Sequence, residues 1–193
     1  MLQAELYFNI TRVYELQSTI SRDSVLNHVK PLIYELKAIM NCNFTIRTAN
    51  INDLENSAVL FNQYRMFYGK VDDINLAREF LRERIQNKQS VIFIAELTSG
   101  ALAAFAQLYP CFSSISAKSA WILNDLYVAQ SARKIGAASA LLSAIIEYGK
   151  STNSSSITLQ TAVDNDSAQA LYKKFGFIQE QQYLTFNFAL NEK

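Results

Sequence analysis

Residues that bind soft metals or interrupt regular structure are scarce in this chain of 193 residues. The sequence has one histidine, two cysteines, five glycines and two prolines. Cys42, Cys111 and His28 form no zinc-ligand spacing, so the sequence predicts no metal site. The low glycine and proline content excludes collagen-like and disordered linker classes. A chain of this size with so few cysteines favours a reducing compartment without a disulfide framework.

An excess of charge of either sign is also missing. Eighteen basic residues against seventeen acidic ones leave a formal charge of +1. This balance disfavours a surface built for nucleic acid or anionic lipid, so we expect neither kind of partner. Residues 1–17 alternate polar and apolar side chains without a continuous apolar run, which predicts neither a signal peptide nor a membrane span. We therefore expect a cytoplasmic protein.

The first part of the chain reads as a helical N-terminal extension over residues 1–43. Residues 2–20 and 24–40 place apolar side chains at helical spacing, which predicts two amphipathic helices. Their apolar stripes must pack against the remaining domain, a partner or a second subunit, so a homodimer is one expectation. Met40 offers an alternative start of the protein, in which case the upstream part is an over-extended start.

The pattern changes at Phe44, where the domain over residues 44–193 begins. We expect strands at 44–48, 90–97, 101–109, 120–128 and 157–162, and two short strands within 177–190. We expect helices from a cap at Asn52 or Asp53 to Tyr68, and at 74–87, 136–150 and 165–175. A Ser-rich loop is expected at 112–119. This order predicts an α/β (α+β) fold with a mixed sheet and helices on both faces.

One strand-to-helix turn in this domain has the features of an anion site. Small residues at 136–139 open the helix after the loop 129–135, and they leave the backbone N–H groups of the first turn accessible. Those groups and the helix dipole favour an anion, and Arg133 and Lys134 add positive charge. The segment predicts a phosphate or pyrophosphate site, with an ordinary strand-to-helix turn as the alternative. It matches neither a Walker loop nor a dinucleotide fingerprint.

Two motifs in order make the sequence resemble the GNAT family of N-acetyltransferases. The family pattern Gln/Arg-x-x-Gly-x-Gly/Ala is matched by Arg133, Gly136 and Ala138. A second family signature is matched by Asn165, Ala168, Leu171-Tyr172 and Gly176-Phe177. The resemblance covers about residues 44–190 and implies a GNAT-like, mostly antiparallel sheet. Lys134 departs from the family, which commonly has glycine there.

The resemblance implies that the domain binds acetyl-CoA as co-substrate and uses no metal. It places the pyrophosphate on the loop amides and the pantetheine arm along the edge of strand 120–128, where a bulge of unknown position splays the strand. Asn165 is then expected to bond the cofactor arm. The implied cofactor-binding residues are Leu126, Tyr127, Val128, Arg133, Lys134, Ile135, Gly136, Ala137, Ala138, Ser139, Asn165 and Ala168.

Two residues carry the expected chemistry. Tyr172 is assigned as the acid that protonates the departing thiolate, with a core aromatic as the alternative. Asp125 is a carboxylate inside an apolar strand, so it either holds or deprotonates a cationic substrate or is paired structurally at the bulge. Polyamine acetyltransferases of the family carry two adjacent acids where this chain has Asn124-Asp125.

Four aromatic residues are candidates for the wall of an amine pocket. Tyr64, Phe67, Tyr68 and Tyr109 lie on the elements that border the acceptor in the family, and core packing is the alternative for each. The resulting hypothesis is an N-acetyltransferase that moves the acetyl group of acetyl-CoA to a primary amine by direct transfer in a ternary complex. The alternatives are a protein lysine or N-terminal acetyltransferase, and a non-catalytic CoA-sensing or dimerisation module.

Overall fold

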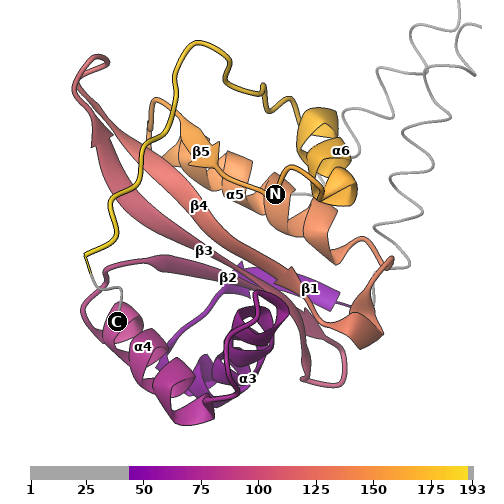
Figure 1. The fold of residues 1–193 in the computed structure, drawn as a ribbon. Helices are drawn as coiled ribbons and strands as arrows, with labels where there is room; N and C mark the ends of the chain where they lie inside the picture. Colours follow the sequence, from indigo (N-terminus) through magenta and orange to yellow (C-terminus); the bar gives the residue numbers. More distant parts are fainter. Residues whose placement is uncertain (1–43, 191–193) are drawn as a thin grey trace, which may run out of the picture. The chain divides into compact units, whose positions relative to one another are not determined.

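A single five-stranded sheet organises the domain (Figure 1). The computed structural model describes residues 44–190, so the two helices expected within residues 1–43 lie outside the described residues. The strands are β1 (Phe44–Thr48), β2 (Val91–Leu97), β3 (Leu102–Ser113), β4 (Lys118–Val128) and β5 (Ile157–Leu159). They follow the order β1-β2-β3-β4-β5, antiparallel except for the parallel pair β4–β5. The expected mixed, mostly antiparallel sheet is confirmed.

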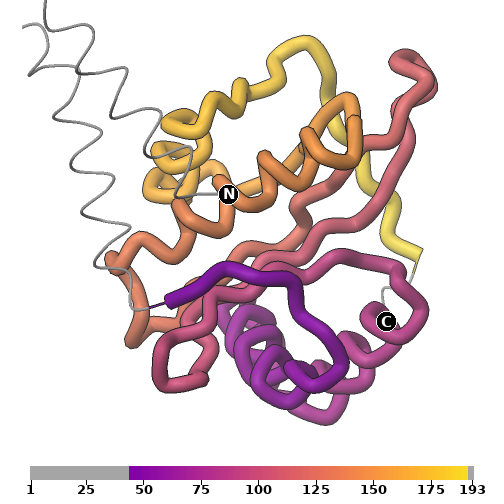
Figure 2. Tube along the Cα trace, turned by 180° about the vertical axis from the view of Figure 1, so that it is seen from behind, coloured from indigo at the N-terminus to yellow at the C-terminus, as the bar shows by residue number. Residues whose placement is uncertain are grey.

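Helices cover both faces of this sheet, as the sequence predicts. They are α3 (Leu54–Phe67), α4 (Ile74–Gln86), α5 (Ala137–Ser151) and α6 (Asp166–Lys174). The α3–α4 pair lies on one face, while α5 and α6 lie on the other (Figures 1 and 2). Within residues 44–190, no helix combines the length and the hydropathy that crossing a bilayer requires.

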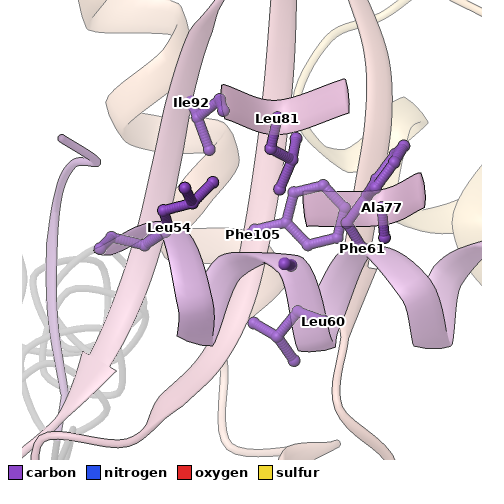
Figure 3. Close-up of a cluster of buried hydrophobic side chains, with 9 residues drawn as sticks. Leu54, Leu60, Phe61, Ala77, Leu81, Ile92 and Phe105 are labelled. Atoms are coloured by element: carbon purple, nitrogen blue, oxygen red, sulfur yellow. The ribbon is translucent and has the colours of Figure 1, made fainter. Parts of the chain in front are cut away.

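The core under α3 and α4 is built around aromatic rings. Phe105 of β3 is fully buried, and its ring meets the ring of Phe61 edge-on with centroids 6.1 Å apart. Phe61 also stacks on Phe80 of α4 at 5.2 Å. Figure 3 shows the rings of Phe61 and Phe105 with Leu54, Leu60, Ala77, Leu81 and Ile92 around them. The cluster fixes α3 and α4 on the sheet, and with them the aromatic residues at the end of α3.

The position at which α3 starts agrees with the sequence expectation, since Asp53 is its N-cap residue, but the expected capping bond does not form. A short 3-10 helix, η2 (Ile51–Asp53), precedes it, and Asn50 caps that turn by accepting a hydrogen bond from the Asn52 amide at 2.9 Å. Asp53 makes no cap bond to α3. Its buried carboxylate accepts hydrogen bonds from the Arg47 guanidinium at 2.7 and 2.8 Å and from the backbone N–H of Asn50 at 2.8 Å. A neighbouring cation on β1 therefore outcompetes the free helix amides for this carboxylate.

We expect Asp53→Asn to destabilise the domain by about 1.5–3 kcal/mol at pH 7, because it removes charged hydrogen bonds. The Arg47 guanidinium holds the pKa of Asp53 below its usual value of 3.8. The stabilisation is therefore present above pH 3.8 and is lost as the pH falls through the lowered pKa. Urea unfolding at pH 7 and pH 3 measures this. An equal gap between the two proteins at both pH values would contradict the assignment.

Strand lengths differ from the expectation at three places, one of which is β5, expected over 157–162 but ending at Leu159. β3 and β4 extend into the expected Ser-rich loop, which shrinks to a turn at 114–117. The two short strands expected within 177–190 do not form, and the apolar residues Leu184, Phe186 and Phe188 are exposed. Strands need neighbours to be stable, and the outer strand β5 spans only three residues. The sheet therefore offers the final segment too short an edge to continue the ladder.

A bulge in β4 prepares the functional site. Gln107 of β3 pairs with Asp125 and Leu108 pairs with Leu123, so Asn124 is the additional residue. The parallel pairing of β4 with β5 stops at Leu123, just before the bulge. Residues 124–128 of β4 consequently have β3 on one side and no described strand on the other.

Candidate active site

The end of β4 presents free backbone groups. The Ala129 amide donates to the Ala103 carbonyl at 2.9 Å. Inter-strand bonds alternate along an antiparallel ladder, so Leu126 and Val128 direct their N–H and C=O groups away from β3. Tyr127 directs its backbone groups toward β3 instead, and its ring lies near Phe105. An extended ligand with amide groups can therefore pair with Leu126 and Val128.

The start of α5 presents a second set of free donors. Gly136 is the N-cap residue, with φ of 89°, and no side chain caps this helix. The Ala140 amide makes the first helical bond, to the Gly136 carbonyl at 3.0 Å. The amides of the three preceding residues, Ala137 to Ser139, have no acceptor within the described part of the chain. Together with the helix dipole they favour an anion at this end.

A groove of about 460 Å³ joins these two features. Eleven of the twelve residues that the resemblance implies for the cofactor line it: Leu126, Tyr127, Val128, Arg133, Lys134, Gly136, Ala137, Ala138, Ser139, Asn165 and Ala168. Ile135 is not among the lining residues, and its side chain is exposed. A larger, open hollow of about 770 Å³ shares Phe67, Tyr127 and Arg133 with the groove.

Asn165 uses part of its amide locally. Its Oδ1 accepts hydrogen bonds from the Ala168 amide and the Ser167 hydroxyl, each at 3.1 Å, and so caps α6. The Nδ2 group has no acceptor among residues 44–190. The oxygen is therefore committed to the helix, while the nitrogen is free to donate into the groove.

Tyr172 lies on α6, outside the residues that line the groove. Its ring meets the ring of Phe177 edge-on at 5.9 Å. Burial raises the pKa of its phenol above the ordinary value, and the nearby phenol of Tyr68 contributes to the rise. Tyr68 lines the groove, so Tyr172 lies near its wall. The phenol is protonated at neutral pH, as a proton donor requires.

A second cavity, of about 350 Å³, adjoins the groove. It is lined by Phe61, Tyr64, Arg65, Tyr68, Lys70, Leu76, Phe80, Tyr109, Asn124 and Asp125. Tyr64 and Tyr68 line both cavities and separate them. Three of the four aromatic residues that the sequence suggested as an amine pocket line this cavity, whereas Phe67 lines the groove.

Asp125 brings a carboxylate to this second cavity. Its residue is only 3 % exposed, and its Oδ1 accepts a hydrogen bond from the Asn124 amide at 3.1 Å. The buried Oδ2 has no hydrogen-bond partner among the described residues. Burial raises the pKa of Asp125, and the neighbouring Tyr64 hydroxyl and Asn124 amide oppose the rise. Burial and the charge of Asp125 likewise raise the pKa of Tyr109 to about 12.

Sequence reasoning missed Gln107. This residue is fully buried, its Nε2 donates to the Ser90 hydroxyl at 2.8 Å, and its Oε1 has no partner among the described residues. It lies directly opposite Asp125, so both side chains project from the same face of the sheet, toward α3. The signal was present as one amide inside the apolar run 101–109.

Comparisons with known proteins agree with this fold and identify the family. The model of the acetyltransferase (GNAT) family matches residues 58–177. The chain therefore belongs to the GNAT family of acetyltransferases, whose members take the acetyl group from acetyl-CoA.

Individual relatives carry related names. An uncharacterized N-acetyltransferase, YhfO, of Bacillus subtilis (strain 168) is 43% identical over 141 residues, which cover 73% of this chain and 94% of that protein. An aminoglycoside N(6')-acetyltransferase type 1 of Serratia marcescens is 25% identical over 116 residues, covering 58% of this chain and 80% of that protein. The crystal structure of a probable acetyltransferase superimposes with a TM-score of 0.74 at 37% identity, covering 77% of this chain and 99% of the other.

The structure gives a physical reason for the family's glycine at position 134. Lys134 has φ of 66°, in the left-handed region that costs a residue with a Cβ about 1–2 kcal/mol. We expect Lys134→Gly to raise stability by about 0.5–1 kcal/mol, after the greater flexibility of unfolded glycine is subtracted. The same change removes a positive charge from the groove, and we expect it to weaken acetyl-CoA binding several-fold at low salt.

Lys134→Asn is the matched variant, because asparagine tolerates this conformation but is uncharged. Urea unfolding and titration calorimetry measure the two effects separately. Weaker binding in both variants, with the larger stability gain in the glycine variant, is the expected result. A glycine variant less stable than the native protein would contradict the strain at position 134.

Proposed function

We propose that this protein transfers the acetyl group of acetyl-CoA to a primary amine by direct transfer in a ternary complex. The observation that carries the proposal is the pair of adjoining cavities. One holds the free strand edge and the free helix amides, and the other holds a buried carboxylate with an unpartnered oxygen. Because Tyr64 and Tyr68 border both cavities, two substrates in them are neighbours, and no covalent enzyme intermediate is needed.

The groove fits the chemical groups of acetyl-CoA. The amides of residues 137–139 and the side chains of Arg133 and Lys134 suit a pyrophosphate. The free edge at Leu126 and Val128 suits the amide groups of an extended pantetheine arm, which adds to a sheet as a strand does. The donor at Asn165 Nδ2 suits a carbonyl of the same arm. When bound, acetyl-CoA supplies a thioester that is open to attack by a neutral amine.

The residues around the second cavity account for the protons. A primary ammonium has a pKa of about 10.4, so it must lose a proton before its nitrogen can attack. Asp125 Oδ2 accepts that proton, directly or through water. The N–C bond forms as the C–S bond breaks, Tyr172 donates its phenolic proton to the sulfur, and the phenolate is reprotonated from the proton that the product nitrogen releases. The net products are an amide, free CoA thiol and one proton.

Acetyl-CoA binding by titration calorimetry, followed by thiol release with a panel of amines, tests the proposal. We expect binding, and turnover with at least one amine. Binding without turnover on small amines, peptides or protein amines would favour a non-catalytic CoA-sensing module, and no binding would reject the proposed function. The unpartnered Oδ2 of Asp125 favours catalysis, because a buried polar atom without a partner is costly unless a substrate supplies a donor. Cytoplasmic location and dimer formation stay predictions from the sequence.

A pair of α5 variants makes the binding test specific. Ala138→Asp puts a negative charge at the free amides, and we expect acetyl-CoA to bind at least about tenfold more weakly because like charges repel. An acidic residue in a first helical turn stabilises the helix, so this variant should fold. Ser143→Asp adds the same charge one turn further along, at an exposed position outside the groove lining, and should bind normally. Equal affinities in the two variants would contradict the proposed pyrophosphate site.

A further inference from the structure

The contents of the second cavity point to the class of acceptor. We propose that the acceptor is an amino-acid-like compound, in which a primary ammonium, an apolar or aromatic body and a carboxylate occur in one small molecule. This inference rests on the proposed function and assigns the substrate of the same site. It follows from three parts of the cavity: a carboxylate at its base, aromatic walls and two cationic side chains.

The base of the cavity suits an ammonium group. Asp125 lines the cavity, and its buried Oδ2 has no hydrogen-bond partner among the described residues, while the Tyr64 hydroxyl lies beside the carboxylate. Burying such acceptors without donors is costly, so a native site that keeps them is expected to receive donors from a ligand. An ammonium has three N–H donors and a positive charge that complements Asp125.

The walls of the cavity suit an apolar body. Five aromatic residues and one leucine line it: Phe61, Tyr64, Tyr68, Leu76, Phe80 and Tyr109. Tyr64 and Tyr68 meet edge-on with ring centroids 5.0 Å apart, so the faces of these rings are not stacked on each other. The volume of about 350 Å³ lies at the small end of ligand pockets, which suits one compact molecule.

Positive charge in the same lining suits a carboxylate on the acceptor. Arg65 Nη1 donates to two neutral oxygens, Asn62 Oδ1 at 3.2 Å and the Asp73 carbonyl at 3.3 Å, and pairs with no acid among residues 44–190. Lys70 likewise has no ion pair within that part of the chain. Two cations against one carboxylate disfavour polycationic acceptors such as polyamines, because the second ammonium would face Arg65 and Lys70.

Initial-rate kinetics with four probe amines test the inference. The probes are L-phenylalanine, its methyl ester, phenethylamine and spermidine. We expect kcat/KM for the free acid to exceed that for the ester and for phenethylamine by about twofold to fivefold, the size of one partly exposed ion pair. Spermidine should be the poorest of the four substrates.

Charge reversal at one cation identifies the residue responsible. Lys70→Glu should abolish or invert the preference for the free acid over the ester, because it puts a negative charge where the carboxylate of the acceptor is proposed to lie. Lys118→Glu makes the same charge change at the exposed start of β4, outside the cavity lining, and should keep the preference. Retention of the native preference in Lys70→Glu would overturn the assignment of Lys70 as the carboxylate partner.

The outcomes separate this inference from the proposed function. Turnover without a preference for the acid over the ester, or with spermidine as the best substrate, overturns the inference and leaves the proposed function intact. Absence of turnover with every amine in the broader panel rejects the proposed function and the inference together. N-acetyl-L-phenylalanine should also compete with the acid at lower concentration than N-acetylphenethylamine does, because only the former carries the carboxylate.

Discussion

Asp125→Asn lowers kcat/KM for the acceptor amine by about 100-fold or more, because the cavity loses both the charge that holds an ammonium and the base that deprotonates it. The dissociation constant of acetyl-CoA should stay within about twofold of the native value, since Asp125 does not line the groove. Initial rates and titration calorimetry measure the two effects. Nearly native kcat/KM in this variant would mean that Asp125 serves only to pair with Asn124 at the bulge.

The same substitution that lowers activity should improve stability, relative to the native protein, as the pH rises. Burial raises the pKa of Asp125 above its usual value of 3.8, so the folded protein binds this proton more tightly than the unfolded chain. The contribution of Asp125 to stability is therefore complete below pH 3.8 and is lost as the pH rises through the raised pKa. Asparagine does not ionise, so Asp125→Asn should gain stability relative to the native protein as the pH rises. The free energies of unfolding of both proteins at pH 4 and pH 8 test this. If the stability of the variant relative to the native protein is lower at pH 8 than at pH 4, the prediction is wrong.

Tyr172→Phe lowers kcat by about 10²–10⁴-fold, the range for a positioned proton donor, and leaves acetyl-CoA binding nearly unchanged. The ring keeps its contact with Phe177, so the fold should persist. Because burial raises the pKa of this phenol, native activity should persist at a pH where an ordinary tyrosine ionises, near 10. The measurement is kcat against pH for both proteins.

Tyr148→Phe provides the control for loss of a hydroxyl. Tyr148 lies on α5 among the rings of Phe93 and Trp121 and does not line either cavity. Its kcat should stay within about twofold of the native value. If Tyr172→Phe behaves like Tyr148→Phe, then Tyr172 is a core aromatic residue, which was the alternative interpretation of the sequence.

Much of the fold could be predicted because it depends on local pattern. Residues close together in the sequence determine the apolar periodicity of α4 and α5 and the turn at Gly100. These elements end within a residue or two of the expected positions. The role of Asp53 could not be predicted, because its carboxylate is claimed by Arg47 from another element. The prediction of two strands within 177–190 was wrong for a similar reason. Polar and apolar residues do alternate there, but a strand also requires a neighbouring strand of adequate length.

The candidate site divides in the same way. Two short motifs indicated the groove residues, since an anion site at a helix start is a local structure. Gln107 and the cationic pair Arg65 and Lys70 were missed, because their proximity to Asp125 depends on how α3 and β3 meet β4. The position of the bulge was equally beyond reach, since register is set by pairing across strands.

The additional residue, Asn124, divides β4 into two halves in which the odd-numbered side chains face opposite sides of the sheet. The ring centroids of Trp121 and of Tyr148 on α5 are 5.3 Å apart, so Trp121 faces α5. Strict alternation of side chains would direct residue 125 to the α5 side of the sheet as well. Beyond Asn124 the odd-numbered side chains instead project toward α3. The first half is accordingly structural, and the second half contributes to the candidate site. Substitutions within 118–123 should therefore change the melting temperature, whereas substitutions within 125–128 should change the choice of acceptor and the rate of turnover.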